Sequence, residues 1–169
     1  MRQRSAAFLL LASLAFAMDA APATPAYAPL LVYGGNWKIT RKSAGANAKP
    51  DELQNQCASV GKFFTCQQTV NGNVTGLLVF APLSQPGHFA TQTVLPEGRA
   101  TGRGELEIAG NRWVFTSSWN QGSTTTRYRT TNIITDKNHI HFEQEESSDG
   151  VRWEVKDSGD DLRTSATAR

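Results

Sequence analysis

The chain has 169 residues, 39% of them hydrophobic, with 17 Lys and Arg against 15 Asp and Glu. Two of the 17 basic residues, Arg2 and Arg4, lie in a segment that we expect to be removed, so 15 basic residues remain against 15 acidic ones. A nearly neutral chain without a basic cluster is not expected to bind nucleic acid, and about 140 folded residues suit a single domain.

Residues 1–17 predict a signal peptide. Arg2 and Arg4 supply a positive start, and the apolar run over 6–17 is too short to cross a bilayer as a helix. Ala15-Phe16-Ala17 fits the small-x-small cleavage pattern, and a second match over 26–28 could move the cut as far as residue 28. A signal anchor is the alternative, but no stop-transfer run follows. We therefore expect a secreted or periplasmic protein without stable membrane insertion after cleavage.

The next elements are a leader and a first strand. Residues 18–29 are rich in Ala and Pro, which predicts a disordered leader that does not pack, followed by a folded domain over 30–165. Over 34–41, Trp37 and Ile39 alternate with polar residues, as expected of a strand. We expect Trp37 to be buried and to close one end of the fold rather than touch a ligand. Residues 49–57 could form a helical turn or a polar connection.

Turn sequences divide the rest of the chain into β-rich runs. Asn71-Gly72 favours the positive φ angles of a tight hairpin. Further strands are expected over 61–70, 74–82, 88–95, 99–109, 112–119 and 124–134, from 139 to the turn at 147–150, and from 151 onward. Short strands joined by tight turns predict an all-β, up-and-down antiparallel meander, and closure into a barrel removes its exposed edges.

The two cysteines are nine positions apart. In an exported chain without a third thiol, we expect Cys57 and Cys66 to form a disulfide. Closing so short a loop stabilises a fold by roughly 2 to 3 kcal/mol. A redox or metal pair is the alternative, but Cys-x8-Cys lacks the two-residue spacing of such sites.

The three histidines are candidate metal or haem ligands. His139 and His141 share one face of a strand and could bind a metal together. Ile140 and Phe142 occupy the other face of the strand, which their apolar side chains predict to be buried. We therefore expect the two histidines to be exposed to solvent. His88 could be a third metal ligand or an axial haem ligand. We predict no metal site and no cofactor.

Catalytic motifs are absent from the sequence. There is no Gly-x-Ser-x-Gly elbow, and Gly102-Arg103-Gly104 is followed by no helix that could bind phosphate. Gly102 and Gly104 instead share a face with Leu106 and Ile108, which is typical of a bulge, a bend or room for a ligand. We predict no catalytic residue and leave enzymatic activity open.

Aromatic residues dominate the expected interior. Alternation directs them inward together with a few polar side chains, which suits a cavity with apolar walls and polar fixing points. A narrow barrel filled by its own side chains is the alternative. The predicted ligand-binding residues are Trp113, Phe115, Trp119, Tyr128, Asn132, Phe142 and Trp153.

Two stretches carry a family resemblance. Gly35-Asn36-Trp37 is similar to the Gly-x-Trp signature of lipocalins. The span 57–163, with CxxxGxFFTCQQTVNG and IHFEQEESSDGVRWEV, resembles uncharacterised secreted bacterial proteins with a lipocalin-like (calycin-like) β-barrel domain. The resemblance implies a barrel of about eight to ten strands and an export signal, without catalytic residues to transfer. The disulfide that ties the tail to the barrel in many animal lipocalins is missing, which argues against transport of retinoid-like ligands.

These features predict a secreted or periplasmic lipocalin-like barrel that binds a small apolar or amphipathic molecule in its interior. Two alternatives stay open from the sequence. One is a haem-binding, metal-binding or enzymatic barrel that uses its histidines, and the other is a non-catalytic interaction protein of the cell envelope. Fold alone does not decide between them.

Overall fold

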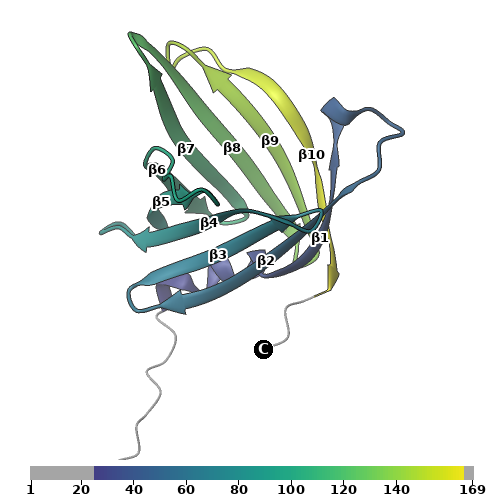
Figure 1. Ribbon diagram of the computed structural model, residues 1–169. Coiled ribbons are helices and arrows are strands. Elements are labelled where there is room, and N and C mark those ends of the chain that lie inside the picture. The colour runs from purple at the N-terminus through teal and green to yellow at the C-terminus, as the bar shows by residue number, and fades with distance from the viewer. Residues whose placement is uncertain (1–24, 166–169) are drawn as a thin grey trace, which may run out of the picture.

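The computed structural model describes residues 25–165, so the expected signal peptide and residues 18–24 of the leader lie outside the described residues. Ten antiparallel strands form a closed barrel in which each strand pairs with the next and β1 pairs with β10 (Figure 1). The strands are β1 Gly35–Arg41, β2 Asp51–Val60, β3 Phe63–Val70, β4 Asn73–Pro82, β5 His88–Val94, β6 Gly104–Ala109, β7 Arg112–Gln121, β8 Thr124–Asp136, β9 His139–Ser147 and β10 Glu154–Ser165. The predicted all-β, up-and-down barrel is confirmed.

Local sequence explains the individual strands. In β1, Trp37 and Ile39 are buried while Lys38 and Thr40 are exposed, as the period of two requires. The turn between β3 and β4 has φ angles of 49° at Asn71 and 81° at Gly72, conformations that Asn and Gly adopt most readily. The predicted hairpin is therefore confirmed.

Residues 49–57 form neither a helical turn nor a polar connection. Strand β2 begins at Asp51 and pairs with both β1 and β3. The inward residues Leu53 and Asn55 are buried, and exposed polar residues alternate with them. The sequence-based interpretation was wrong because a buried Asn weakens the apolar pattern, although the period of two is still present.

The last strand begins later than expected. The carboxylate of Asp149 accepts hydrogen bonds from the backbone N–H groups of Val151 and Arg152, both at 2.8 Å. These bonds hold the chain in a turn, Val151 is 81% exposed, and β10 begins only at Glu154. The strand expected from residue 99 likewise begins at Gly104, after an isolated bridge between Val94 and Ala100.

The segment before β1 covers one end of the barrel. It contains two short 3-10 helices, η1 Pro25–Tyr27 and η2 Pro29–Tyr33, and a third, η3 Lys42–Ala44, follows β1 (Figure 1). Tyr27, 4% exposed, and Leu30, fully buried, join an apolar cluster of Phe64, Cys66, Phe80, Phe89, Leu106 and Trp113. Within the expected leader, Tyr27 therefore packs against the barrel, whereas Ala26, Ala28 and Pro29 are exposed. In residues 25–165, no helix has the length and apolar character needed to span a membrane.

Candidate functional site

The barrel interior contains a cavity of about 480 Å³. Inward-facing side chains of β1 to β5 and β7 to β10 line it, together with Tyr33 from η2. Its apolar wall includes Trp37, Ile39, Leu53, Phe80, Phe115 and Phe142. Its polar groups include Arg41, Gln68, Thr93, Thr130, Gln144 and Asp161. The interior is therefore a cavity of mixed polarity, and the barrel is not filled by its own side chains.

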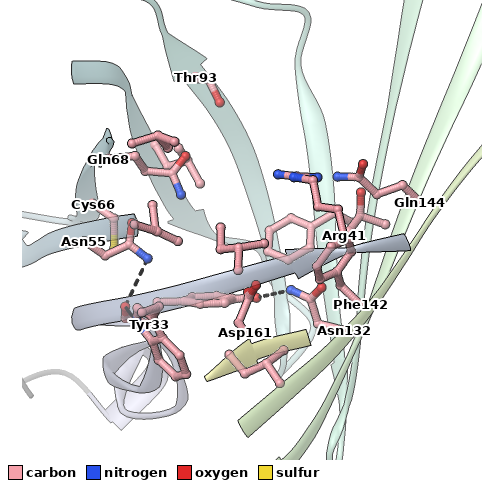
Figure 2. A pocket seen from close by; sticks show the side chains of 18 of the residues that line it. Tyr33, Arg41, Asn55, Cys66, Gln68, Thr93, Asn132, Phe142, Gln144 and Asp161 are labelled. Atoms are coloured by element: carbon pink, nitrogen blue, oxygen red, sulfur yellow. Dashed lines mark hydrogen bonds between the residues drawn. The ribbon is translucent and has the colours of Figure 1, made fainter. Parts of the chain in front are cut away.

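Tyr33 connects the segment before β1, which closes one end of the barrel (the closing segment), to strands β1, β2 and β8. Its backbone carbonyl accepts hydrogen bonds from Nδ2 of Asn55 at 3.1 Å and from Nε1 of Trp37 at 3.0 Å. Its hydroxyl oxygen accepts a hydrogen bond from Nδ2 of Asn132 at 2.8 Å, and Figure 2 shows contacts at both ends of the residue. Burial raises the pKa of the Tyr33 hydroxyl well above its usual value. The hydroxyl therefore stays neutral at physiological pH.

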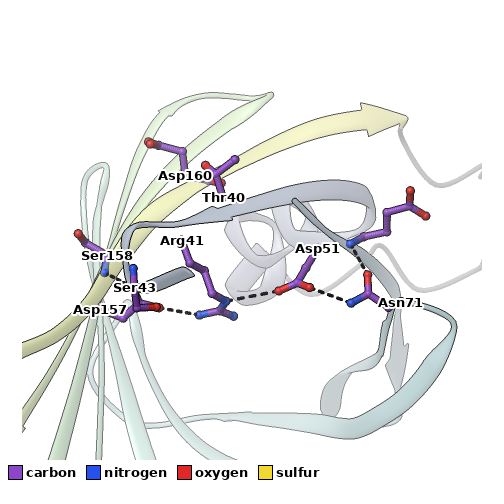
Figure 3. A network of polar contacts seen from close by, with 9 residues as sticks. Thr40, Arg41, Ser43, Asp51, Asn71, Asp157, Ser158 and Asp160 are labelled. Carbon is purple, nitrogen blue, oxygen red and sulfur yellow. Dashed lines mark hydrogen bonds and ion pairs between the residues drawn. The ribbon is translucent and has the colours of Figure 1, made fainter. Parts of the chain in front are cut away.

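Arg41 enters the cavity already paired with carboxylates. Its guanidinium lies 3.6 Å from Asp51 and 3.2 Å from Asp157, between the two acidic side chains (Figure 3). The same group lies 5.5 Å from the ring centroid of Phe142. Asp157 also accepts a hydrogen bond from the backbone N–H of Ser43 at 3.2 Å. The network fixes Arg41 and offsets its charge.

Two acceptor atoms in the cavity lining are unsatisfied. Among residues 25–165, Oδ1 of Asn55 and Oδ1 of Asp161 are buried and have no hydrogen-bond partner. Burial raises the pKa of the Asp161 carboxyl to about 6, with Arg41 acting in the opposite direction and Asp160 adding to the rise. A buried acceptor without a partner is costly, so such atoms mark places where a bound molecule could donate a hydrogen bond.

Three of the predicted ligand-binding residues line the cavity together, namely Phe115, Asn132 and Phe142. Trp113 does not line the cavity, because its side chain is buried with Tyr27 in the apolar cluster at the closed end of the barrel. Its Nε1 donates to the backbone carbonyl of Gly110 at 3.3 Å.

Trp119 and Tyr128 lie outside the cavity, in an adjoining depression that shares Phe115 with it. Trp119 is 47% exposed and Tyr128 is 37% exposed. The last pair between β6 and β7 is Gly104 with Ser117, so Trp119 lies where β7 continues beyond the shorter strand. The inward direction predicted from alternation therefore does not bury Trp119, because β6 ends before reaching it.

Trp153 lies on the outer surface, which corrects its expected place in the interior. It precedes β10, and the guanidinium of Arg129 lies 4.1 Å from its ring centroid. Arg129 also makes a bidentate contact with Glu145, with distances of 2.5 and 2.6 Å. Val151 and Val155, two positions before and after Trp153, are exposed.

All three histidines of the chain lie away from the cavity. Nε2 of His139 and Nδ1 of His141 contact the same oxygen, Oδ1 of Asp160, at 2.9 and 3.0 Å. His88 alternates with the buried Phe89, which directs it outward. In the described part of the chain, no three His, Cys, Asp or Glu side chains are arranged to hold a metal ion. A haem or metal bound inside the barrel through a histidine therefore has no support.

The sequence pattern did not single out four residues of the cavity lining, namely Arg41, Asp161, Asn55 and Tyr33. Alternation with Trp37 and Ile39 places Arg41 on the inward face, so that signal was present. Tyr33 carries no such signal, because it precedes the strands and reaches the cavity only through the closing segment.

The disulfide between Cys57 and Cys66 is present, with the two Cα atoms 4.0 Å apart. The residues are directly opposite one another on β2 and β3, and the expected pairing is confirmed. Cys66 also contributes to the cavity wall.

The fold and its interior cavity define a closed, up-and-down antiparallel β-barrel of ten strands with room for a small molecule inside. No protein-family model matches the chain, and no curated protein matches it. Among solved structures, the chain is similar to Rv2717c from M. tuberculosis, with 17% identity over 83% of this chain and 98% of that chain and a TM-score of 0.47. It is also similar to apo lipid binding protein 8 of Caenorhabditis elegans, with 9% identity over 78% and 95% of the two chains and a TM-score of 0.47. Likeness at this level carries no information on ligand or activity.

Proposed function

We propose that this protein is an exported binding protein that holds a small amphipathic molecule inside its barrel. The observation that carries the proposal is the cavity of about 480 Å³, which lies within the range of small-molecule sites. Its apolar wall would contact the body of the ligand, and its inward polar groups would orient the polar end. Two buried acceptors of the lining, Oδ1 of Asn55 and Oδ1 of Asp161, have no protein donor and could accept hydrogen bonds from a bound molecule.

A pair of substitutions on β8 tests the proposal. Thr130 lines the cavity, whereas the neighbouring Thr131 projects to the opposite face of the strand. Binding of the neutral dye Nile red, followed by its fluorescence, should weaken at least about tenfold in Thr130→Trp, which fills the cavity, and persist in Thr131→Trp. Equal binding by both variants, or no binding by the unchanged protein, would contradict the proposal.

The natural ligand can be sought directly. Native mass spectrometry of protein purified from its own host should show added mass that organic solvent removes. The same added mass should be lost in Thr130→Trp and kept in Thr131→Trp. Added mass that persists in both variants would place the bound molecule elsewhere.

The proposal includes export, with residues 1–17 as the signal peptide. The Cys57–Cys66 disulfide supports an oxidising compartment. Tyr27 packs against Phe64 and Phe89, with ring centroids 5.8 and 6.0 Å apart, which favours a cut before residue 25 over one after Ala28. N-terminal sequencing of exported protein should therefore give a first residue between 18 and 25. A start at Met1 or at Pro29 would refute this part of the proposal.

A further inference from the structure

The two charged side chains of the cavity lining differ in whether they have a partner of opposite charge. Arg41 and Asp161 are its charged side chains within residues 25–165. Arg41 lies between Asp51 and Asp157, so its positive charge is already balanced by two carboxylates. A carboxylate head group of a ligand would find no free cation there and would meet three acidic side chains nearby. The cavity is therefore unsuited to an anionic head group.

Asp161 is in the opposite situation. Its Oδ1 is buried and has no hydrogen-bond partner among the described residues. Oδ1 of Asn55 lines the same cavity, is equally without a partner there, and belongs to a residue that is only 4% exposed. Nδ2 of Asn55 donates a hydrogen bond to the backbone carbonyl of Tyr33, and Nδ2 of Asn132 donates one to the Tyr33 hydroxyl oxygen (Figure 2). The lining thus offers acceptors that need donors.

From this arrangement we infer that the ligand is an amphipathic amine whose ammonium group binds the carboxylate of Asp161. The inference rests on the proposed function of the cavity and names the chemical class of its ligand. An ammonium group supplies three N–H donors and a positive charge, and charge-assisted hydrogen bonds are roughly twice as strong as neutral ones. The apolar body of the amine would lie along Trp37, Leu53 and Phe115.

Binding of an amine should depend on pH. The groups around Asp161 are Arg41 on β1, Tyr33 on η2, His139 on β9 and its own neighbour Asp160. Because the pKa of Asp161 is raised to about 6, the carboxylate is mostly ionised at pH 8 and mostly protonated at pH 5. A protonated carboxyl no longer attracts an ammonium group, so affinity for an amine should fall over this range.

Three ligands with the same alkyl chain provide the test, with Nile red displacement as the measurement. At pH 8, dodecylamine should displace the dye at a concentration at least about tenfold lower than dodecanoate, with dodecanol between them. The preference should shrink at pH 5. Asp161→Asn should abolish the preference for dodecylamine over dodecanol, each measured against the affinity of that variant for Nile red. Asp160→Asn is the matched control, since Asp160 contacts His139 and His141 on the outer face, and it should keep the preference.

The outcomes separate the inference from the proposed function. Dodecanoate binding as tightly as dodecylamine, or an unchanged preference in Asp161→Asn, would overturn the inference while Nile red binding upheld the cavity. Failure of Nile red and all three ligands to bind would overturn both. The comparison of ligands on the unchanged protein decides the question even if Asp161→Asn fails to fold.

Discussion

The hydroxyl oxygen of Tyr33 accepts a hydrogen bond of 2.8 Å from Nδ2 of Asn132, a residue 99 positions later in the chain. Tyr33 belongs to the segment that closes one end of the barrel, and Asn132 belongs to the wall formed by β8. Both side chains also line the cavity. The bond therefore joins the closed end of the barrel to the wall of the candidate site.

Tyr33→Phe should destabilise the protein by about 1 to 2 kcal/mol, because the substitution leaves the buried Nδ2 of Asn132 without its acceptor. Urea denaturation gives the free energy of unfolding. Tyr128→Phe is the control, since Tyr128 is partly exposed, and it should stay within about 0.5 kcal/mol of the parent. Equal effects of the two substitutions would show that the bond does not contribute.

Asp161→Asn should stabilise the ligand-free protein at pH 7.5 and leave it unchanged at pH 3.5. The folded pKa of about 6 lies above the ordinary value of 3.8, so folding favours the protonated carboxyl. That contribution is complete below pH 3.8 and is lost as the pH rises through 6. The difference between the two pKa values corresponds to about 3 kcal/mol of stability lost when Asp161 ionises. Asn does not ionise, so the variant keeps this stability at pH 7.5. Urea titrations of both proteins from pH 3.5 to 7.5 would measure it; a constant difference between them would contradict the prediction.

Arg129→Ala should cost about 3 kcal/mol at pH 7.5, because Glu145 is buried and would lose its bidentate partner. The hydrogen bond from Arg129 lowers the pKa of Glu145, so this contribution is present above the unfolded pKa and is lost as the pH falls through the folded one. The cost should therefore be smaller at pH 4. Replacing both residues, with Arg129→Met and Glu145→Leu, should cost less than Arg129→Ala alone. A double variant that is less stable than the single one would disprove this account.

Trp37→Ala should cost about 3 to 5 kcal/mol and Trp37→Phe less, because the ring is buried and Arg163 lies 4.1 Å from its centroid. Denaturant titration measures both variants. The expectation that Trp37 closes the end of the barrel without touching a ligand needs revision, since the residue lines the cavity. Trp37→Phe should therefore also change the affinity for Nile red, and unchanged affinity would favour the original interpretation.

Thiol titration of the denatured, unreduced protein should find no free thiol, because both cysteines of the chain are paired. Reduction should lower the free energy of unfolding by about 2 to 3 kcal/mol, as expected for so short a loop. Replacing both cysteines by Ser should cost more than reduction alone, because Cys66 is buried beside apolar side chains. Free thiols in the untreated protein would exclude the disulfide.

The sequence by itself determined the strands and most of the turns. Trp37 and Ile39 alternate with polar neighbours, and Asn71-Gly72 favours a tight turn. Strands and turns can therefore be predicted from short stretches of the chain. The pairing of Cys57 with Cys66 was equally accessible, because few residues separate them. Alternation also directed Phe115, Asn132 and Phe142 inward, and these are the predicted site residues that line the cavity.

Only the tertiary structure decided which inward residues meet. Arg41 reaches Asp157 across 116 positions because closure of the barrel brings β1 beside β10. Trp119 has the inward direction of Phe115 but remains exposed, since β7 outlasts its neighbour β6. Tyr27 is buried because it packs on apolar side chains at one end of the barrel, and these side chains come together only when the strands have closed. Direction is a local property of a strand, whereas burial and pairing depend on what the register of distant strands places opposite each side chain.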